Sequence, residues 1–503
     1  MKHFTFILIM LYLSVSAAQE TTSIEITPEK KYVMDWLGQS STGEKFGKIS
    51  NAIWSYAELG LMEFRSSLLL IENLEEEGFK VEKGLAGMPT CFVGSYGSGK
   101  PVVGILAEFD ALPGLSQKGR VPKQDPVIQG APGHGCGHNA MGTASIAAAI
   151  AVKKAMKKYK INGTIKVFGS PAEESLISRP YMVRAGLFEG VDVLVDNHFS
   201  SDFGTSYGVS GNALISVIFS FKGKTSHGAY AWSGVSALDA VELMNVATNY
   251  LREHLYYTYR MHYVIINGGQ APNVVRDRAS VWYFLRNSDD RIEEMYDKVV
   301  NCAKGAALAT GCELDKIQVL TAIHQKHASQ SLAGLFQKNI EYIGIPQWTE
   351  EEQLFARSLQ KELGEKEKGM PVKVKVLKEP QSVFTGGAST DVGEVSLIAP
   401  TATIIFPGKV PGTIGHHWST VACTYGTAAH KGLIAGAQAI GASAIDLLTK
   451  PEELENIRTE FREYSKVHPY KSFLPKDATP PLDLNRELME KWRPLMEKYY
   501  QSE

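Results

Sequence analysis

Residues 102–110, VVGILAEFD, place a short apolar run with branched side chains directly before two acidic residues. Three more runs of this kind lie at 164–168, 191–195 and 402–406. Short apolar runs that end in polar or Gly/Pro clusters are typical of strands buried on both faces. We therefore expect four buried strands, each with polar side chains at its carboxyl end.

Helical stretches lie between these runs. Residues 142–158, GTASIAAAIAVKKAMKK, are rich in alanine and end in lysines, which favours a helix with cations at its negative end. Strands that alternate with helices predict a mostly parallel sheet covered on both faces. The predicted fold class is therefore α/β.

The segment 209–330 follows a different pattern. Its apolar spacing predicts the order strand, helix, strand, strand, helix, strand, at 215–221, 240–251, 263–266, 279–285, from about 290, and at 317–320. This order is that of a small ferredoxin-like α+β domain. We expect it to be inserted into the α/β domain, which would comprise 19–208 and 331–450, with a polar tail at 451–503 that wraps the surface.

Composition excludes several classes of protein. The 503 residues are 44% hydrophobic and 21% charged, which is typical of a globular chain and not of a disordered one. The net charge of −2 gives no general attraction to nucleic acid or to an anionic membrane. Five cysteines are too few for a disulfide framework.

The N-terminus has the pattern of a cleaved secretory signal at 1–18. Lys2 and His3 precede an apolar run at 4–15, and Ser16-Ala17-Ala18 supplies small residues for cleavage. The run is too short to span a bilayer, although an uncleaved anchor is the alternative. No other stretch is expected to span, so we expect a secreted or periplasmic protein without stable membrane association.

Metal-binding residue types gather where the predicted strands end. They are Glu108 and Asp110, Glu173 and Glu174, Asp196 and His198, and His416 and His417, with Cys136 and His138 before the alanine-rich helix. Ligand sites of open α/β sheets lie at the carboxyl ends of strands. Each residue alone has an ordinary structural explanation, but Cys, His and carboxylate together predict a metal site.

Five ligands suit two divalent ions when one ligand bridges them, as in two-metal hydrolases. Such ions lower the pKa of bound water, and a second carboxylate is then needed to move its proton to the leaving amine. The adjacent pair Glu173-Glu174 offers one side chain for the metal and one for the proton.

Several motifs resemble those of the co-catalytic metallopeptidases, the family of aminoacylase, carboxypeptidase G and the plant auxin-conjugate amidohydrolases, and above all its p-aminobenzoyl-glutamate hydrolase branch. The motifs are GHGCGHNAMGTA (133–144), SPAEES (170–175), DNHF (196–199), SALDAVELMN (236–245), GGQAPNVV (268–275), STDVGEVS (389–396) and GHHW (415–418). The resemblance covers the chain from about residue 30 to the tail.

The resemblance implies a role for most of these residues. The metal ligands would be Cys136, His138, Glu174, His198 and His416. Glu173 would be the general base, and Asp110 would support the site. The inserted domain would act as a lid and dimerisation domain whose His227 completes the active site of the partner subunit and stabilises the oxyanion.

Some assignments have alternatives. Asn273 and Arg286 resemble contacts to the substrate, although Arg286 is also explained as a surface arginine. Gly386 and Gly387 either offer backbone N–H groups to a carboxylate or form a plain turn. The family usually has a small hydroxyl residue where His417 stands, so either histidine of the pair is a candidate ligand, and His416 is preferred.

The predicted function is a metal-dependent amidohydrolase that cleaves N-acyl or N-aroyl amino acids such as p-aminobenzoyl-glutamate, with two zinc or manganese ions and Glu173 as the base. We expect a homodimer joined through the lid domain. The alternatives are a dipeptidase or carboxypeptidase that acts on nutrient peptides, and a binding protein without activity. The pair Glu173-Glu174 argues against a binding protein, which has no need of a general base.

Overall fold

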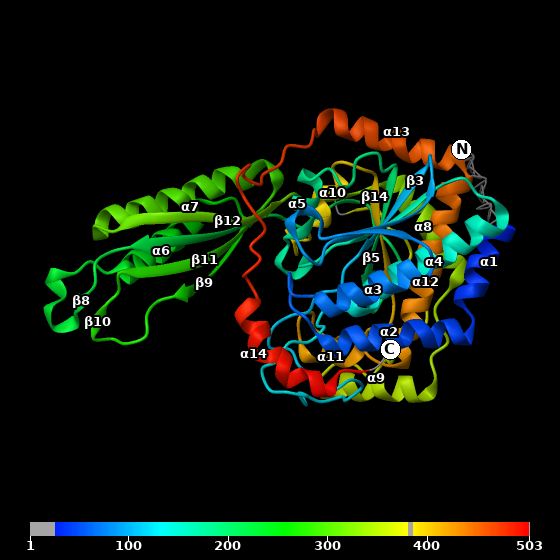
Figure 1. Cartoon of the computed structure of the whole chain (residues 1–503), viewed down its shortest axis with the longest axis horizontal. Coiled ribbons are helices and arrows are strands. Elements are labelled where there is room, and N and C mark those ends of the chain that lie inside the picture. Colours follow the sequence, from blue (N-terminus) through cyan, green and yellow to red (C-terminus); the bar gives the residue numbers. More distant parts are fainter. Residues whose placement is uncertain (1–25, 381–385, 502–503) are drawn as a thin grey trace, which may run out of the picture.

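The computed structural model describes residues 26–380 and 386–501, and Figure 1 shows a large α/β domain with a smaller domain that projects from one side. The predicted signal peptide lies outside the described residues. The predicted fold class is confirmed: a mixed, mostly parallel sheet forms the large domain, and a separate antiparallel sheet forms the small one.

The large sheet has the strand order β1-β2-β4-β3-β5-β14. Strands β4, β3, β5 and β14 run parallel. At one edge β2 pairs antiparallel with β4, and β1 pairs antiparallel with β2. The four predicted strands are β3, β4, β5 and β14, and the antiparallel pair was not predicted. The bounds are β1 Lys80–Lys83, β2 Phe92–Ser98, β3 Val102–Ala107, β4 Gly163–Gly169, β5 Val193–Phe199 and β14 Thr401–Phe406.

Two long helices, α4 and α12, form the centre of the core. The alanine-rich helix α4 packs against β3, β4 and β5, and α12 packs against α4, β5 and β14. The alanines of α4 are fully buried, so helix and sheet approach closely. The helices of this domain are α1 Pro28–Leu37, α2 Ser40–Tyr56, α3 Phe64–Glu76, α4 His138–Tyr159, α5 Ser178–Arg184, α8 Gln330–Ile343, α9 Glu350–Glu362, α10 Val392–Ser396, α11 Trp418–Cys423 and α12 Thr427–Thr449.

Helix α12 corrects one expectation from the sequence. It is long and apolar enough to cross a membrane by composition, so the expectation that no stretch after the signal reaches that threshold was wrong. However, 83% of its most apolar window is buried inside the protein. Its apolar surface is therefore explained by its place in the core.

The small domain, the lid domain of the sequence analysis, has a four-stranded antiparallel sheet in the order β12-β7-β11-β9 with two helices packed on it. A two-stranded ribbon of β8 and β10 lies at its far end in Figure 1. A second ribbon, of β6 and β13, lies where the chain enters and leaves this domain. The bounds are β6 Gly208–Ser210, β7 Ala213–Lys222, β8 Ser226–His227, α6 Ala237–Leu251, β9 Arg260–Asn267, β10 Val274–Val275, β11 Arg278–Asn287, α7 Asp289–Thr310, β12 Glu313–Ile323 and β13 Lys326–Ala328.

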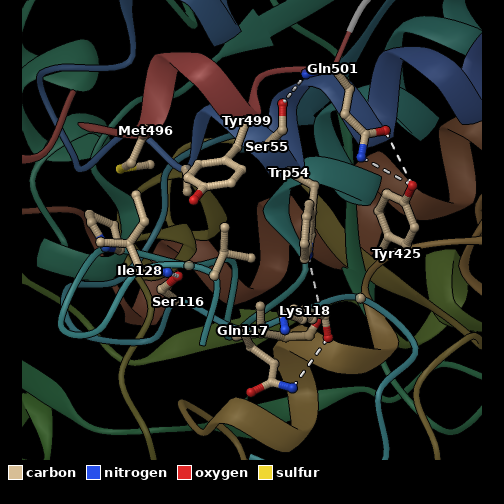
Figure 2. Close-up of a pocket in the computed structure, with 16 residues that line it drawn as sticks. Trp54, Ser55, Ser116, Gln117, Lys118, Ile128, Tyr425, Met496, Tyr499 and Gln501 are labelled. Atoms are coloured by element: carbon tan, nitrogen blue, oxygen red, sulfur yellow. Dashed lines mark hydrogen bonds between the residues drawn. The ribbon is translucent and has the colours of Figure 1, made fainter. Parts of the chain in front are cut away.

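The tail contains two helices, α13 (Pro451–Val467) and α14 (Arg486–Met496), that the sequence analysis did not distinguish. Only Leu454 and Ile457 of α13 are buried, so its apolar signal is weak. Figure 2 shows how the end of the tail docks: Gln501 hydrogen-bonds Tyr425 and Ser55 beside a cavity of about 290 Å³. Arg493 anchors the tail further through the buried carboxylate of Glu58 at 3.3 Å.

We predict that Gly432→Ala destabilises the large domain, whereas Gly334→Ala does not. A Cβ at Gly432 in α12 would lie 1.5 Å from the carbonyl oxygen of Pro407, directly after β14. Such overpacking costs about 1–3 kcal/mol. A Cβ at Gly334 in α8 meets nothing within 4 Å, so alanine there gains about 0.5–1 kcal/mol from helix propensity. Thermal melting of the two variants tests this, and an equal melting temperature would contradict the packing.

Candidate metal centre

The carboxyl ends of the central strands open into one cavity of about 440 Å³. Eight residues singled out in the sequence line it: Glu108, Cys136, Glu173, Glu174, Asp196, His198, Arg286 and His416. These residues are far apart in the chain, and the sheet topology brings them together at one edge.

A glycine before α4 brings the thiol to the strand edge. Gly137 has φ +98°, and a Cβ there would lie 2.6 Å from the ring of Phe199. This close approach places Cys136 Sγ 3.4 Å from His198 Nε2. The other ring nitrogen of His198, Nδ1, lies 2.9 Å from the Phe199 carbonyl oxygen. When Nδ1 donates to that oxygen, the Nε2 lone pair is free for a metal.

His138, the first residue of α4, is oriented by Asp110. Its Nδ1 lies 2.8 Å from Asp110 Oδ1, and the second Asp110 oxygen accepts the backbone N–H of Glu174 at 3.0 Å. The tautomer that donates from Nδ1 leaves the Nε2 lone pair facing Glu108 Oε2 at 3.3 Å and Glu173 Oε2 at 3.8 Å. That Nε2 is buried and has no hydrogen-bond partner among the described residues, as expected of a metal ligand.

Two groups of side chains near the cavity offer ligand atoms that could bind a metal ion. Cys136, Glu174 and His416 form one set, in which Glu174 Oε2 and His416 Nε2 are 3.2 Å apart. His138, Glu173 and Glu108 form the other. Within each set the ligand atoms lie within 4.8 Å of one another. Glu174 Oε1 is also buried without a hydrogen-bond partner in the described chain, so the residues present fit bound cations.

The two adjacent histidines, His416 and His417, have different contacts in the structure. His416 has φ +54°, a left-handed conformation, and its ring reaches Glu174. His417 instead caps helix α11, where its Nδ1 accepts the backbone N–H of Ser419. The geometry therefore agrees with the preference for His416.

The electrostatics of the site favour cations. The side chains of Glu173 and Glu174 are only 12% and 7% exposed. Burial raises the pKa of Glu174 to about 8 and that of the Cys136 thiol to about 11. Burial and the neighbouring carboxylates Glu108 and Asp391 raise the pKa of Glu173 well above its usual range. Bound cations would relieve this crowding and displace protons, so metal affinity is expected to fall as the pH falls.

A buried arginine behind the cavity was missed by the sequence analysis. Arg179 of α5 pairs with Glu108 Oε1 at 2.7 Å and with Asp391. It thereby fixes Glu108, whose other oxygen lies 3.3 Å from His138 Nε2. One signal was present, a charged residue inside the otherwise mostly apolar stretch LISRPYMV at 176–183.

Besides His138 and Asp110, which are buried behind the lining residues, four predicted residues do not line the cavity. His227 and Asn273 lie at the far end of the lid domain, where the Gly228 N–H donates to the Asn273 carbonyl. The cavity wall begins at Ala388, while Gly386 and Gly387 lie just before it beside Asn212. One chain alone therefore does not bring His227 or Asn273 to the cavity, whereas Gly386 and Gly387 lie beside its wall.

The sequence of this chain is similar to those of several known proteins. The model of peptidase family M20/M25/M40 matches residues 104–418. One of the p-aminobenzoyl-glutamate hydrolase subunits of Escherichia coli (strain K12) is 34% identical over 467 residues, which cover 87% of this chain and 96% of that protein. The Xaa-Arg dipeptidase of Mus musculus is 29% identical over 436 residues, or 83% and 89% of the two chains.

A solved structure shares the fold. The Bacillus subtilis YXEP protein, a dinuclear metal binding peptidase of the M20 family, has a TM-score of 0.52 and 16% identity, and the match covers 81% of this chain and 99% of that one. At this identity the likeness concerns the fold alone.

We predict that Asp110→Asn weakens metal binding. The carboxamide no longer holds His138 as a carboxylate does, and loss of such a supporting carboxylate typically costs about 10- to 100-fold in metal affinity. Titration of the metal-free variant with zinc, followed by calorimetry, measures the change. Asp125→Asn is the control, because Asp125 pairs with Lys118 outside the cavity. Equal affinity in the wild type and Asp110→Asn would show that Asp110 does not support the site.

Proposed function

This chain belongs to peptidase family M20/M25/M40, a family of metallohydrolases, and we propose that it cleaves the amide bond of N-acyl or N-aroyl amino acids such as p-aminobenzoyl-glutamate. The observation that carries this proposal is the cavity in which Glu173 lies among the metal-donor side chains. The relative from Escherichia coli supports the choice of substrate.

The proposal includes two divalent ions per chain, held by Cys136, His138, Glu174, His198 and His416. Bound there, they would supply an acidified water molecule and polarise the substrate carbonyl. Thiolate and imidazole ligands suit zinc, and the carboxylate suits manganese as well.

Glu173 is the proposed general base. Its Oε2 lies 3.8 Å from His138 Nε2, and Glu173 lines the cavity. Because burial and neighbouring carboxylates raise its pKa, the side chain can take a proton from water and hold it at neutral pH. The same proton can then pass to the leaving amine. Arg286, which lines the cavity and hydrogen-bonds only Ser389 in the described chain, would bind the substrate carboxylate.

A homodimer would complete the site. The His227 side chain is exposed at the far end of the lid domain and far from its own cavity, so it is available to a second chain. In that position its imidazole would stabilise the oxyanion of the partner's substrate.

The lid domain also carries a surface suited to pairing. Strand β9 is an edge strand, and Tyr263, Val264, Ile265 and Ile266 on it are all exposed. Unpaired edges with apolar side chains are prone to pair with another chain. We therefore place the dimer contact on the lid domain.

The N-terminal pattern supports a further part of the proposal, export as a secreted or periplasmic protein. An exported form whose mass corresponds to a chain without residues 1–18 would support it. A cell-associated form that retains those residues would contradict it.

The alternative that a known protein favours is a dipeptidase, because the mouse relative is an Xaa-Arg dipeptidase. A screen of p-aminobenzoyl-glutamate, acyl-amino acids and dipeptides with added zinc or manganese separates the two. A preference for dipeptides would replace the proposal, and hydrolysis of none of them would indicate a binding protein.

We predict that Glu173→Gln binds metal and folds as the wild type does, but loses about 10²–10⁴-fold in kcat, because removal of a general base costs this much. Metal content and melting temperature provide the controls. Turnover close to that of the wild type would exclude Glu173 as the base.

Mixing two inactive variants tests the shared site. In a dimer of Glu173→Gln and His227→Ala, one of the two sites combines an intact Glu173 with an intact His227 from the other chain. Random reassociation of equal amounts should therefore restore about a quarter of wild-type activity. No recovery in mixtures shown to contain heterodimers would mean that His227 acts within its own chain.

A further inference from the structure

Two cationic side chains line the catalytic cavity without an ion pair to any carboxylate of the described residues: Arg286 and Lys326. Arg286 donates to Ser389 Oγ at 2.9 Å, and its Nε is buried with no hydrogen-bond partner among those residues. Lys326 Nζ donates to Thr403 Oγ1 at 2.9 Å. Each cation thus has a neutral hydroxyl group as its partner.

The nearby acidic groups are engaged elsewhere. Glu108 pairs with Arg179, Glu174 faces His416, and Glu173 faces His138. Asp196 accepts a hydrogen bond from Thr403 Oγ1 at 2.6 Å and forms no ion pair with Lys326 among the described residues. A charged group removed from water is costly unless an opposite charge accompanies it. Burial accordingly lowers the pKa of Arg286. A ligand with negative charge would relieve this cost for both cations.

The two cations come from different elements around the cavity. Arg286 is near the end of β11 in the lid domain. Lys326 is in β13, opposite Ser210 of β6, and its Nζ contacts Thr403 of β14. Thr403 is opposite Asp196, two residues before His198 on β5, so Lys326 lies on the wall next to the metal ligands.

The remaining wall combines polar residues with the apolar residues Leu176, Ala388, Val392 and Ile405. Hydroxyl groups of Ser200, Ser206 and Ser210 line it, together with Ser389 and Thr390. The hydroxyl-bearing residues of this wall suit a substrate side chain that accepts hydrogen bonds.

Resting on the amidohydrolase function proposed above, we propose that Lys326 determines specificity by binding the second carboxylate of an N-acyl dicarboxylic amino acid, glutamate or aspartate, while Arg286 binds the α-carboxylate. A substrate that ends in lysine or arginine brings a like charge to Lys326 and is disfavoured. A substrate with a neutral side chain leaves the ammonium group without a counter-ion.

The test compares p-aminobenzoyl-glutamate with p-aminobenzoyl-glutamine, which differ in one carboxylate. Hydrogen bonds to charged groups predict that the wild type prefers the glutamate compound about 10- to 100-fold in kcat/KM. Lys326→Met should lose this preference through a higher KM for the glutamate compound, with the glutamine compound unchanged. Lys326→Arg should retain it in part, and Lys375→Met, which alters an exposed pair with Asp202, should retain it fully.

Two outcomes overturn the inference. One is a Lys326→Met variant whose kcat/KM falls by the same factor with both substrates. That result would mean that Lys326 supports the site without recognising the carboxylate. The other is a wild type that shows no preference.

A binding measurement keeps this inference separate from the proposed function. Calorimetry with the metal-loaded Glu173→Gln variant gives the Kd of both compounds without turnover. Tighter binding of the glutamate compound that Lys326→Met abolishes supports the inference even if the wild type hydrolyses neither compound. The inference is rejected if the glutamate compound has the same Kd for the Glu173→Gln variant with and without the Lys326→Met substitution. This holds whether or not hydrolysis is observed.

Discussion

The mutual repulsion of buried acidic groups is the constraint on which the site depends. Glu108, Glu173 and Glu174 lie around one histidine, and Asp110 lies directly behind it. Burial, together with the like charges nearby, raises the pKa of Glu173 and Glu174. Arg179 compensates part of this charge, through Glu108 and Asp391. Divalent cations would compensate the rest, which links folding of this edge of the sheet to metal binding.

The backbone holds this arrangement in place. Gly137, Ala172 and His416 adopt left-handed conformations next to the residues that face the cavity. Non-glycine residues adopt such conformations at a cost, and they persist where the surrounding structure enforces them. Ala172 is held by Glu63, which accepts its N–H at 2.8 Å. The positions of the donor atoms are therefore set before a ligand arrives, which favours both metal binding and catalysis.

The sequence was sufficient to predict the parallel strands, because each is a short apolar run with branched side chains that ends in polar residues. It also indicated the inserted domain, because apolar residues there alternate with polar ones instead of forming continuous runs. It could not predict that Asp110 orients His138 or that Arg179 holds Glu108, because such contacts depend on side-chain direction in three dimensions. The choice between His416 and His417 depends on where each ring points, toward Glu174 or toward Ser419. Lys326 could not be distinguished from the many lysines and arginines until the cavity was known.

The central claim is that side chains from distant parts of the chain bind a pair of cations at one sheet edge. X-ray absorption of the zinc-loaded protein, together with its metal content, tests this claim most directly. The account predicts two ions per chain with sulfur among their ligands, and loss of the sulfur signal in Cys136→Ser. A zinc-loaded protein without sulfur ligation, or with zinc bound equally well after all five ligand residues are replaced, would contradict it.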